Sequence, residues 1–220
     1  MVEKLDNILL SKDVRVNFLN AYKDQEFKRW ILTRLPEIEK CRNQQQDNPW
    51  HVYNCLDHIL VSVEEINKQT ESLDYDTRRK LAYCMFLHDI GKPDCYIRRY
   101  SKQYGRDVDS FFNHNKKSAE IAKETLGDFG FSKEEVRQMT MLIYKHDIFM
   151  FISLNETSNK FHKRLSPEVI KDEIKDFEKV GDGENLLRYL ILMGRADNRA
   201  QNPEMTDESL RLLSAMEEMV

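Results

Sequence analysis

The feature that most constrains this chain is a helical pattern of apolar residues that recurs over most of the stretch from residue 50 to residue 200. Apolar side chains recur there at i, i+3, i+4 and i+7, the spacing that places them on one face of an α-helix. No stretch alternates clearly enough to require a sheet, and the 7 glycines leave few helix-breaking positions. The sequence therefore predicts an all-α fold, a helical bundle with additional N- and C-terminal helices.

Turn and capping signals divide this pattern into separate helices. Ser132 and Glu135 have the spacing of a capping box, and Ser166 precedes a proline in the manner of a helix start. The segment 95–113 is expected to be a long irregular loop, and such loops in compact domains are often functional. The expected helices are 50–69, 76–90, 114–127, 133–147, 166–179, 183–200 and 206–219, with shorter ones inside 3–20 and 24–40.

Composition excludes some classes of protein. Hydrophobic residues make up 40% of the chain, enough for a packed core, and the net charge of −4 gives no sign of a globally basic nucleic-acid binder. No apolar run is long enough to cross a membrane, and the N-terminus lacks the apolar block of a secretory signal. The four cysteines form no Cys-x-x-Cys pair and are interpreted as reduced thiols. We expect a cytoplasmic protein with no membrane partner.

Ionisable side chains fall on apolar helix faces, where their presence needs an explanation. His88, His146 and Asp197 each continue the apolar stripe of the helix expected to carry them. A buried, unpaired carboxylate is too costly to keep ionised, so Asp197 must be protonated, paired or bound to a metal. Arg195 and Arg199 are alternative partners for it, and a single histidine on an apolar face is more often a core residue. A shared metal would satisfy several such side chains at once.

Further candidates flank these residues. His51 and His58 are seven positions apart on one expected helix and should point the same way. Lys92 follows the helix that carries His88, where a solvated cation is favoured by the helix dipole. His51 is either a substrate contact or a structural hydrogen-bonding group. His162 is interpreted as a surface residue in a basic stretch.

Three other groups leave alternatives open. The aromatic residues Tyr144, Phe149 and Phe151 either line a pocket for a base or pack in the core. The basic run within 98–106 either helps to hold a polyanionic substrate or forms a solvated loop. Asp107-Val108-Asp109 is interpreted as a polar loop.

Three motifs carry a resemblance to a known family. They are Asp57-His58-Ile59-Leu60, then His88-Asp89-Ile90-Gly91-Lys92-Pro93, and finally Arg195-Ala196-Asp197-Asn198. In these motifs, and over roughly residues 50–200, the sequence resembles the HD-domain metal-dependent phosphohydrolase superfamily. The resemblance divides the chain into an N-terminal helical extension (1–45), an HD phosphohydrolase domain (46–202) and a C-terminal helical tail (203–220).

The resemblance implies a metal site. In members with two metals, the aspartate at the place of Asp89 bridges the ions, and histidines at the places of His114 and His146 join the ligands. In members with one metal, those two histidines face the substrate. Lys92 and His51 would contact phosphate. The implied cofactor is one or two divalent ions per chain, with Mn, Fe, Co, Ni, Zn and Mg all open. The core ligands that it implies are His58, His88, Asp89 and Asp197.

The resemblance also implies an activity. Within the superfamily, the sequence is most similar to the HD domain attached to bacterial tRNA nucleotidyltransferases, although no nucleotide-adding head is expected here. We expect hydrolysis of a phosphomonoester or phosphodiester, with a nucleotide or related small molecule as partner and with Asp89 and Lys92 as catalytic residues. Two alternatives stay open: an RNA-end or 2′,3′-cyclic phosphodiesterase, and a non-catalytic metal-containing binding module.

Overall fold

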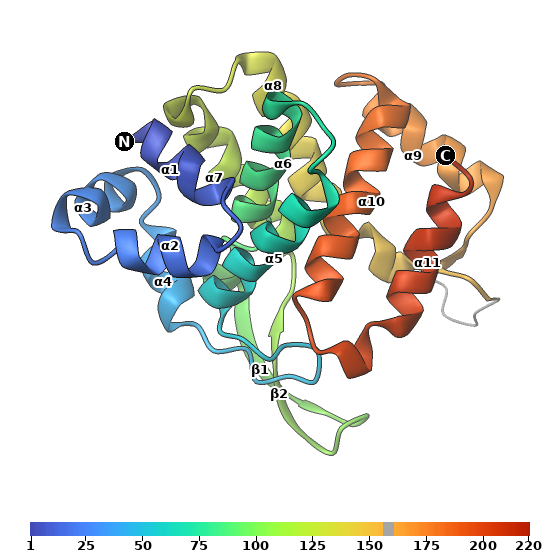
Figure 1. The fold of residues 1–220 in the computed structure, drawn as a ribbon. Helices are drawn as coiled ribbons and strands as arrows, with labels where there is room; N and C mark the ends of the chain where they lie inside the picture. Colours follow the sequence, from blue (N-terminus) through green and yellow to red (C-terminus); the bar gives the residue numbers. More distant parts are fainter. Residues whose placement is uncertain (156–160) are drawn as a thin grey trace.

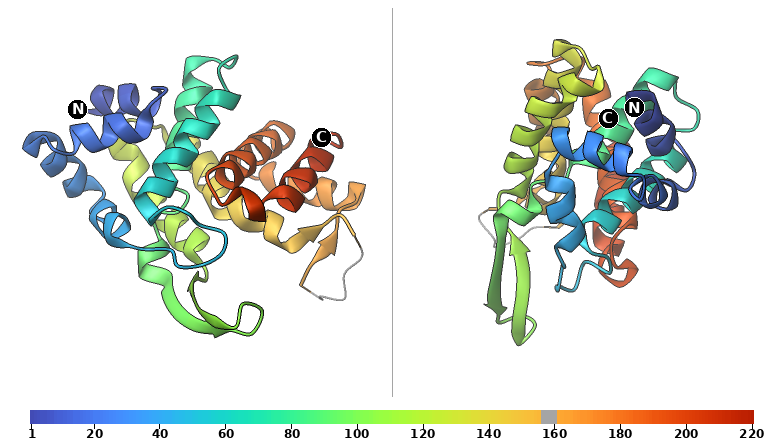
Figure 2. Two further views of the ribbon diagram at one scale, coloured as in Figure 1. Left: turned by 60° about the horizontal axis from the view of Figure 1, so that its bottom comes forward. Right: turned by 90° about the vertical axis from the view of Figure 1, so that its left-hand side faces the viewer.

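The computed structural model describes residues 1–155 and 161–220, and it confirms the all-α prediction. Helices α5 (Cys55–Gln69), α6 (Tyr75–Leu87) and α10 (Gly183–Arg199) pack against one another in the middle of the molecule (Figure 1). Four shorter N-terminal helices cover one side of this centre (Figures 1 and 2). They are α1 (Val2–Leu9), α2 (Val14–Ala21), α3 (Gln25–Arg34) and α4 (Glu37–Asn43).

The remaining helices complete the bundle. Helix α7 (His114–Thr125) packs along α8 (Lys133–Lys145), and α10 packs against both α9 (Pro167–Phe177) and α11 (Asp207–Glu217). The expected starts of α8 and α9 are confirmed, because Ser132 and Glu135 form a capping box and the Ser166 side chain accepts a hydrogen bond from the Val169 amide. Short 3-10 turns join several elements: η1 (Lys92–Cys95), η2 (Leu126–Phe129), η3 (His146–Phe151) and η4 (Pro203–Met205).

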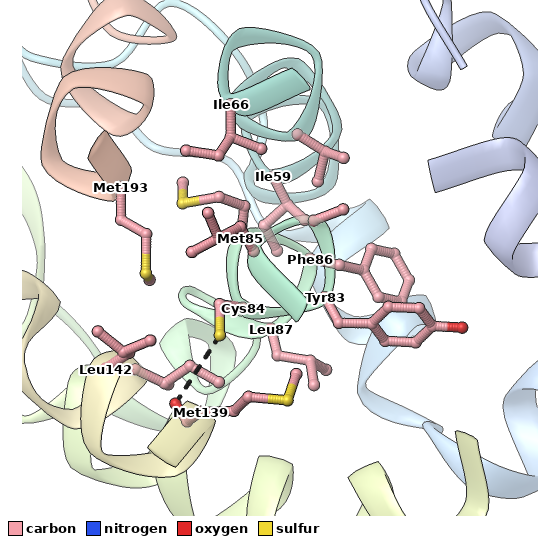
Figure 3. Packing of buried hydrophobic residues seen from close by; sticks show 14 of the residues in the cluster. Ile59, Ile66, Tyr83, Cys84, Met85, Phe86, Leu87, Met139, Leu142 and Met193 are labelled. Carbon is pink, nitrogen blue, oxygen red and sulfur yellow. Dashed lines mark hydrogen bonds between the residues drawn. The ribbon is translucent and has the colours of Figure 1, made fainter. Parts of the chain in front are cut away.

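Helix α6 lies at the centre of the core. Every residue from Leu81 to Leu87 is at most 1% exposed, so this half of the helix is apolar on all sides and is surrounded by other elements. Figure 3 shows this packing, with the Cys84 thiol directed at the Met139 carbonyl of α8. This buried half of α6 leads straight into His88 and Asp89, so the packing of the helix sets the position of their backbone.

Several helix boundaries differ from the prediction. Helix α5 begins at Cys55, because the Asn54 side chain caps it by accepting a hydrogen bond from the Asp57 amide. The expectation that His51 and His58 share one helix is therefore wrong, since His51 lies in the preceding loop. Helix α6 ends at Leu87, so His88 and Asp89 lie in the turn that follows it.

The segment 95–113 is not an irregular loop. It forms an antiparallel hairpin of β1 (Tyr96–Ser101) and β2 (Arg106–Phe111), which projects from the helical body (Figure 2). Asp107 and Asp109 thus lie on a strand, which corrects the interpretation of a polar loop. Strand β1 is almost wholly exposed, so it has no buried face to produce an alternating pattern. A second, two-residue pair joins β3 (Ile152–Ser153) to β4 (Lys163–Arg164).

No helix in the described part of the chain is both long and apolar enough to cross a membrane. The four cysteines are free thiols, as expected. The division at residues 45 and 202 stays a prediction.

Candidate metal centre

Six of the candidate residues converge on one place from five parts of the fold. His58 comes from α5, the His88-Asp89 pair from the turn after α6, and Asp197 from the last turns of α10. His114 is the first residue of α7, and His146 is the first residue of η3. Four of them are buried, with His58 at 0%, His88 and Asp89 at 1% and His146 at 5% exposure, whereas His114 and Asp197 are partly exposed.

The first ligand group consists of two imidazoles between two carboxylates. The Nε2 atom of His58 lies 3.1 Å from Asp89 Oδ2 and 2.9 Å from Asp197 Oδ1. The Nε2 atom of His88 lies 3.3 Å and 3.5 Å from the same two oxygens. One potential ligand atom from each of the four residues lies within 4.8 Å of the others, so the group could hold a metal ion.

The second ligand group shares Asp89 with the first. Its other carboxylate oxygen, Oδ1, lies 3.0 Å from His114 Nε2 and 3.6 Å from His146 Nε2. The two Nε2 atoms are themselves 3.2 Å apart. Asp89 therefore presents one oxygen to each group, which is the arrangement of a carboxylate that bridges two cations.

The hydrogen bonds of the imidazoles fit a metal. Each Nδ1 faces a backbone carbonyl, at 3.3 Å for His58, 2.7 Å for His88 and His146, and 2.8 Å for His114. A proton on each Nδ1 would leave the Nε2 lone pair free to bind an ion, the arrangement of most histidines that bind metals. The Nε2 atoms of His58 and His88 are buried and find no hydrogen-bond partner among the described residues. Such buried polar atoms are costly unless something else binds them.

Charges around the first group set its protonation. Burial alone would lower the pKa of His88, but the carboxylates of Asp89 and Asp197 raise it to about 10. Burial also opposes ionisation of both aspartates, yet the neighbouring imidazoles, together with Lys92 beside Asp89, hold their carboxyl pKa values well below the usual range. The site therefore keeps two carboxylates ionised, and a metal would displace the proton on His88.

Lys92 lies beside the cluster and is not solvated. Its side chain is 5% exposed, and Nζ lies 2.5 Å from Asp89 Oδ2. Nζ also lies 2.9 Å from Gln46 Oε1 and 3.0 Å from His51 Nε2. The Asn48 side chain fixes the other nitrogen of His51, with Oδ1 2.8 Å from Nδ1. The alternative of a solvated helix-end cation is therefore wrong.

The β1–β2 hairpin supports the loop that carries these groups. The Asp47 amide donates to Asp109 Oδ2 at 2.8 Å, and the Asp109 amide donates to the Asp47 carbonyl at 2.9 Å. Arg98 pairs with both carboxylates, and Arg106 pairs with Asp47. These two arginines thus serve ion pairs within the protein. Nothing in the sequence pattern indicated that Asp109 would reach the segment that precedes α5.

Neither Arg195 nor Arg199 forms an ion pair with Asp197 within the described part of the chain. Arg195 pairs with Glu217 on α11, at 2.5 Å. The contacts of Asp197 are instead His58, His88 and the side-chain amide of Gln201, whose Nε2 donates to Oδ2 at 3.2 Å. The pairing of Asp197 with Arg195 or Arg199 is therefore wrong.

Asp147 is a neighbour of the cluster that was not singled out from the sequence. Its carboxylate oxygens lie 3.3 Å from His114 Nε2 and 3.4 Å from His146 Nε2. Its position directly after His146 was the available signal.

Among the nearby aromatic residues, Phe149 is buried, whereas Tyr144 and Phe151 are about half exposed. His162 is partly exposed and lies against Phe151.

Comparisons with known proteins show a distant similarity over most of the chain. No protein-family model matches it. It is 26% identical over 194 residues to the bifunctional uridylyltransferase/uridylyl-removing enzyme of Vibrio atlanticus (strain LGP32), covering 82% of this chain and 19% of that protein. It is 24% identical over 184 residues to the enzyme of the same name from Gluconobacter oxydans (strain 621H), covering 78% and 17%. The chain thus spans about a fifth of the length of these relatives.

Proposed function

We propose that this chain is a divalent-metal-dependent phosphohydrolase of the HD superfamily. The observation that supports this most is the pair of ligand groups joined by Asp89, in which four imidazole Nε2 atoms converge on its two carboxylate oxygens. A set with this many nitrogen donors suits Mn, Fe, Co, Ni or Zn better than Mg, which prefers oxygen ligands. An ion bound here would polarise a phosphoryl oxygen and make a water molecule acidic enough to yield hydroxide near neutral pH.

The proposed ligands divide between two positions. His114 and His146 with Asp89 would hold a second ion. The backbone carbonyls that face their Nδ1 atoms fix both rings, so the Nε2 atoms meet the ion without reorganisation. The first ion would be held by His58, His88, Asp89 and Asp197.

Lys92 is proposed to stabilise negative charge on the phosphoryl group. Although burial opposes its charge, Asp89 raises the pKa of Lys92, so the ammonium stays protonated. Burial and the nearby ammonium lower the pKa of His51 well below its usual value, so this imidazole is neutral and accepts a hydrogen bond from Lys92. A cation fixed in a dry site stabilises developing charge far better than a mobile one in water. His51 is thus proposed to position Lys92.

The proposed substrate is a nucleotide ester. The relatives are named for removing uridylyl groups, and a uridylyl group is a nucleotide joined through its phosphate. This name favours a nucleotidyl ester over a simple phosphomonoester.

A panel of substrates tests the proposal. The purified chain would be assayed with Mn²⁺, Co²⁺, Ni²⁺, Zn²⁺ and Mg²⁺ against p-nitrophenyl phosphate, its bis ester, the p-nitrophenyl ester of thymidine 5′-phosphate and 2′,3′-cyclic AMP. We expect metal-dependent hydrolysis of the nucleotidyl ester that a chelator stops and Mn²⁺ restores. Turnover of the cyclic ester alone would favour the RNA-end alternative. No turnover of any ester, with metal bound stoichiometrically, would contradict the proposal and favour a binding module.

A further inference from the structure

Asp147 brings a third carboxylate to the cluster. Its side chain is 20% exposed, whereas that of Asp89 is 2% exposed, so Asp147 lies where the second ligand group meets solvent. Oδ2 lies 3.3 Å from His114 Nε2, and Oδ1 lies 3.4 Å from His146 Nε2. The carboxylate thus faces both imidazoles of that group at once.

The second group is short of negative charge without Asp147. Its two imidazoles are neutral when they bind a metal, and Asp89 would share its single charge between two ions. The Lys92 ammonium, 2.5 Å from Asp89 Oδ2, offsets part of that charge as well. A dication at this position would then keep most of its charge uncompensated in a partly buried site, where charge is costly.

The geometry of the two rings leaves little freedom. The Nδ1 contacts with the Phe111 and Ile143 carbonyls hold the Nε2 atoms of His114 and His146 at 3.2 Å from each other. If both Nδ1 atoms carry the proton, two lone pairs face each other at that distance, which is repulsive. A metal ion bound by both Nε2 atoms would remove this repulsion, and Asp147 is placed to balance the charge of that ion.

We propose that Asp147 is the carboxylate ligand that completes the second metal position, with Asp89, His114 and His146, and that it decides whether the protein binds one ion or two. This inference rests on the proposed function, because it takes the first position as a metal site. It adds a ligand from a side chain that lies outside the HD motifs recognised in the sequence.

Variants of Asp147 test the inference by metal binding. Asp147→Asn removes the charge at nearly constant shape, Asp147→Ser removes the ligand, and Asp147→Glu keeps the carboxylate. Glu184→Gln is the matched control, because Glu184 is 57% exposed and pairs with Arg188 on the surface. Metal-free proteins would be titrated with Mn²⁺. Elemental analysis would give the number of bound ions, and electron paramagnetic resonance would show whether the bound Mn²⁺ ions are exchange-coupled.

We expect two Mn²⁺ ions and an exchange-coupled signal in the unchanged protein, in Asp147→Glu and in the control. In Asp147→Asn and Asp147→Ser, the second ion should bind about 10- to 100-fold more weakly, and the signal should become that of isolated Mn²⁺. Two tightly bound, coupled ions in both charge-removing variants would overturn the inference. A single ion in the unchanged protein would also overturn it but would leave the proposed function standing. No bound ion at all would contradict the proposed function itself.

Discussion

At the scale of single residues, the orientation of the imidazoles matters more than their number. A histidine can point either ring nitrogen into a site. When Nδ1 is held by a backbone carbonyl, Nε2 is the nitrogen that faces the site. Four histidines of the cluster have such a carbonyl, so their Nε2 atoms all turn toward the carboxylates. The sequence indicates which histidines could gather. It does not show which backbone carbonyls their Nδ1 atoms meet, because those contacts depend on the fold.

Uptake of metal should release protons at this site. Because the pKa of His88 is raised to about 10, this imidazole is protonated in the metal-free protein at all pH values below that point. A metal requires the neutral form, so the affinity for Mn²⁺ should rise about tenfold per pH unit between pH 6 and pH 9 for one displaced proton. Calorimetric titrations in buffers of different ionisation enthalpy measure the protons directly. Affinity that is flat with pH, with no proton released, would contradict this account.

Lys92 should affect turnover more than metal binding. Lys92→Met keeps much of the buried volume but removes the ammonium, and we expect kcat to fall by about 100- to 1000-fold. The Mn²⁺ content should stay unchanged, because Lys92 is not a ligand. Lys40→Met is the matched control, since Lys40 is 51% exposed and pairs with Asp94 outside the cluster. Equal turnover in the two variants would show that Lys92 has no part in the reaction.

At the scale of elements, the turn after α6 depends on a close approach between backbones. A Cβ atom added at Gly91 would lie 2.6 Å from the Ser118 amide nitrogen and 2.9 Å from the His114 carbonyl. Neither backbone group can move aside as a flexible side chain could. The Gly91 amide also donates to the Ser118 hydroxyl at 2.9 Å. The glycine thus lets the start of α7, with His114, come against the turn that carries Asp89.

Gly91→Ala should therefore separate these two elements. We expect a loss of about 1–3 kcal/mol in the free energy of unfolding, together with weaker Mn²⁺ binding. Gly127→Ala is the matched control, because a Cβ there meets nothing within 4 Å. Urea denaturation of metal-free protein gives the stability, and Mn²⁺ titration gives the affinity. A Gly91 variant as stable as the Gly127 variant would show that the close approach is not needed.

The helices with one buried face could be predicted from the sequence, whereas the exposed hairpin and the loop of His51 could not. Helices with one buried face, such as α8 and α9, have clear periodicity and capping residues, so their positions were predictable. The hairpin was missed because β1 buries none of its residues and Arg98 is used in ion pairs rather than in packing. The loop of His51 was missed because the cap at Asn54 and the partners Gln46 and Asn48 act through tertiary contacts.

At the scale of the whole molecule, a buried ion network ties the cluster to the C-terminal half. Lys145, the residue before His146, is 8% exposed and lies 2.5 Å from Glu173 and 2.7 Å from Asp176, both on α9. Glu173 is itself 9% exposed. The network joins α8 to α9 at the point where α8 ends and η3 begins, so it also helps to fix where His146 lies.

Removing one member of this network should be costly. Lys145→Met leaves the Glu173 carboxylate buried without a cation, and we expect a loss of about 3–5 kcal/mol in the free energy of unfolding. Lys179→Met, which removes a 66% exposed partner of Asp176, should cost at most about 1 kcal/mol. Adding Glu173→Leu to Lys145→Met should recover stability. Denaturation midpoints of the four proteins measure this, and equal losses in the two lysine variants would argue against the network.

The most direct test of the central claim is the metal content and turnover of Asp89→Ala, measured on the same preparation. Asp89 presents one oxygen to each ligand group, so its removal should empty both positions. We predict that bound Mn²⁺ and hydrolysis of the p-nitrophenyl ester of thymidine 5′-phosphate are lost together, while the helical circular-dichroism spectrum is kept. Retained metal with full turnover in a folded Asp89→Ala protein would contradict the account.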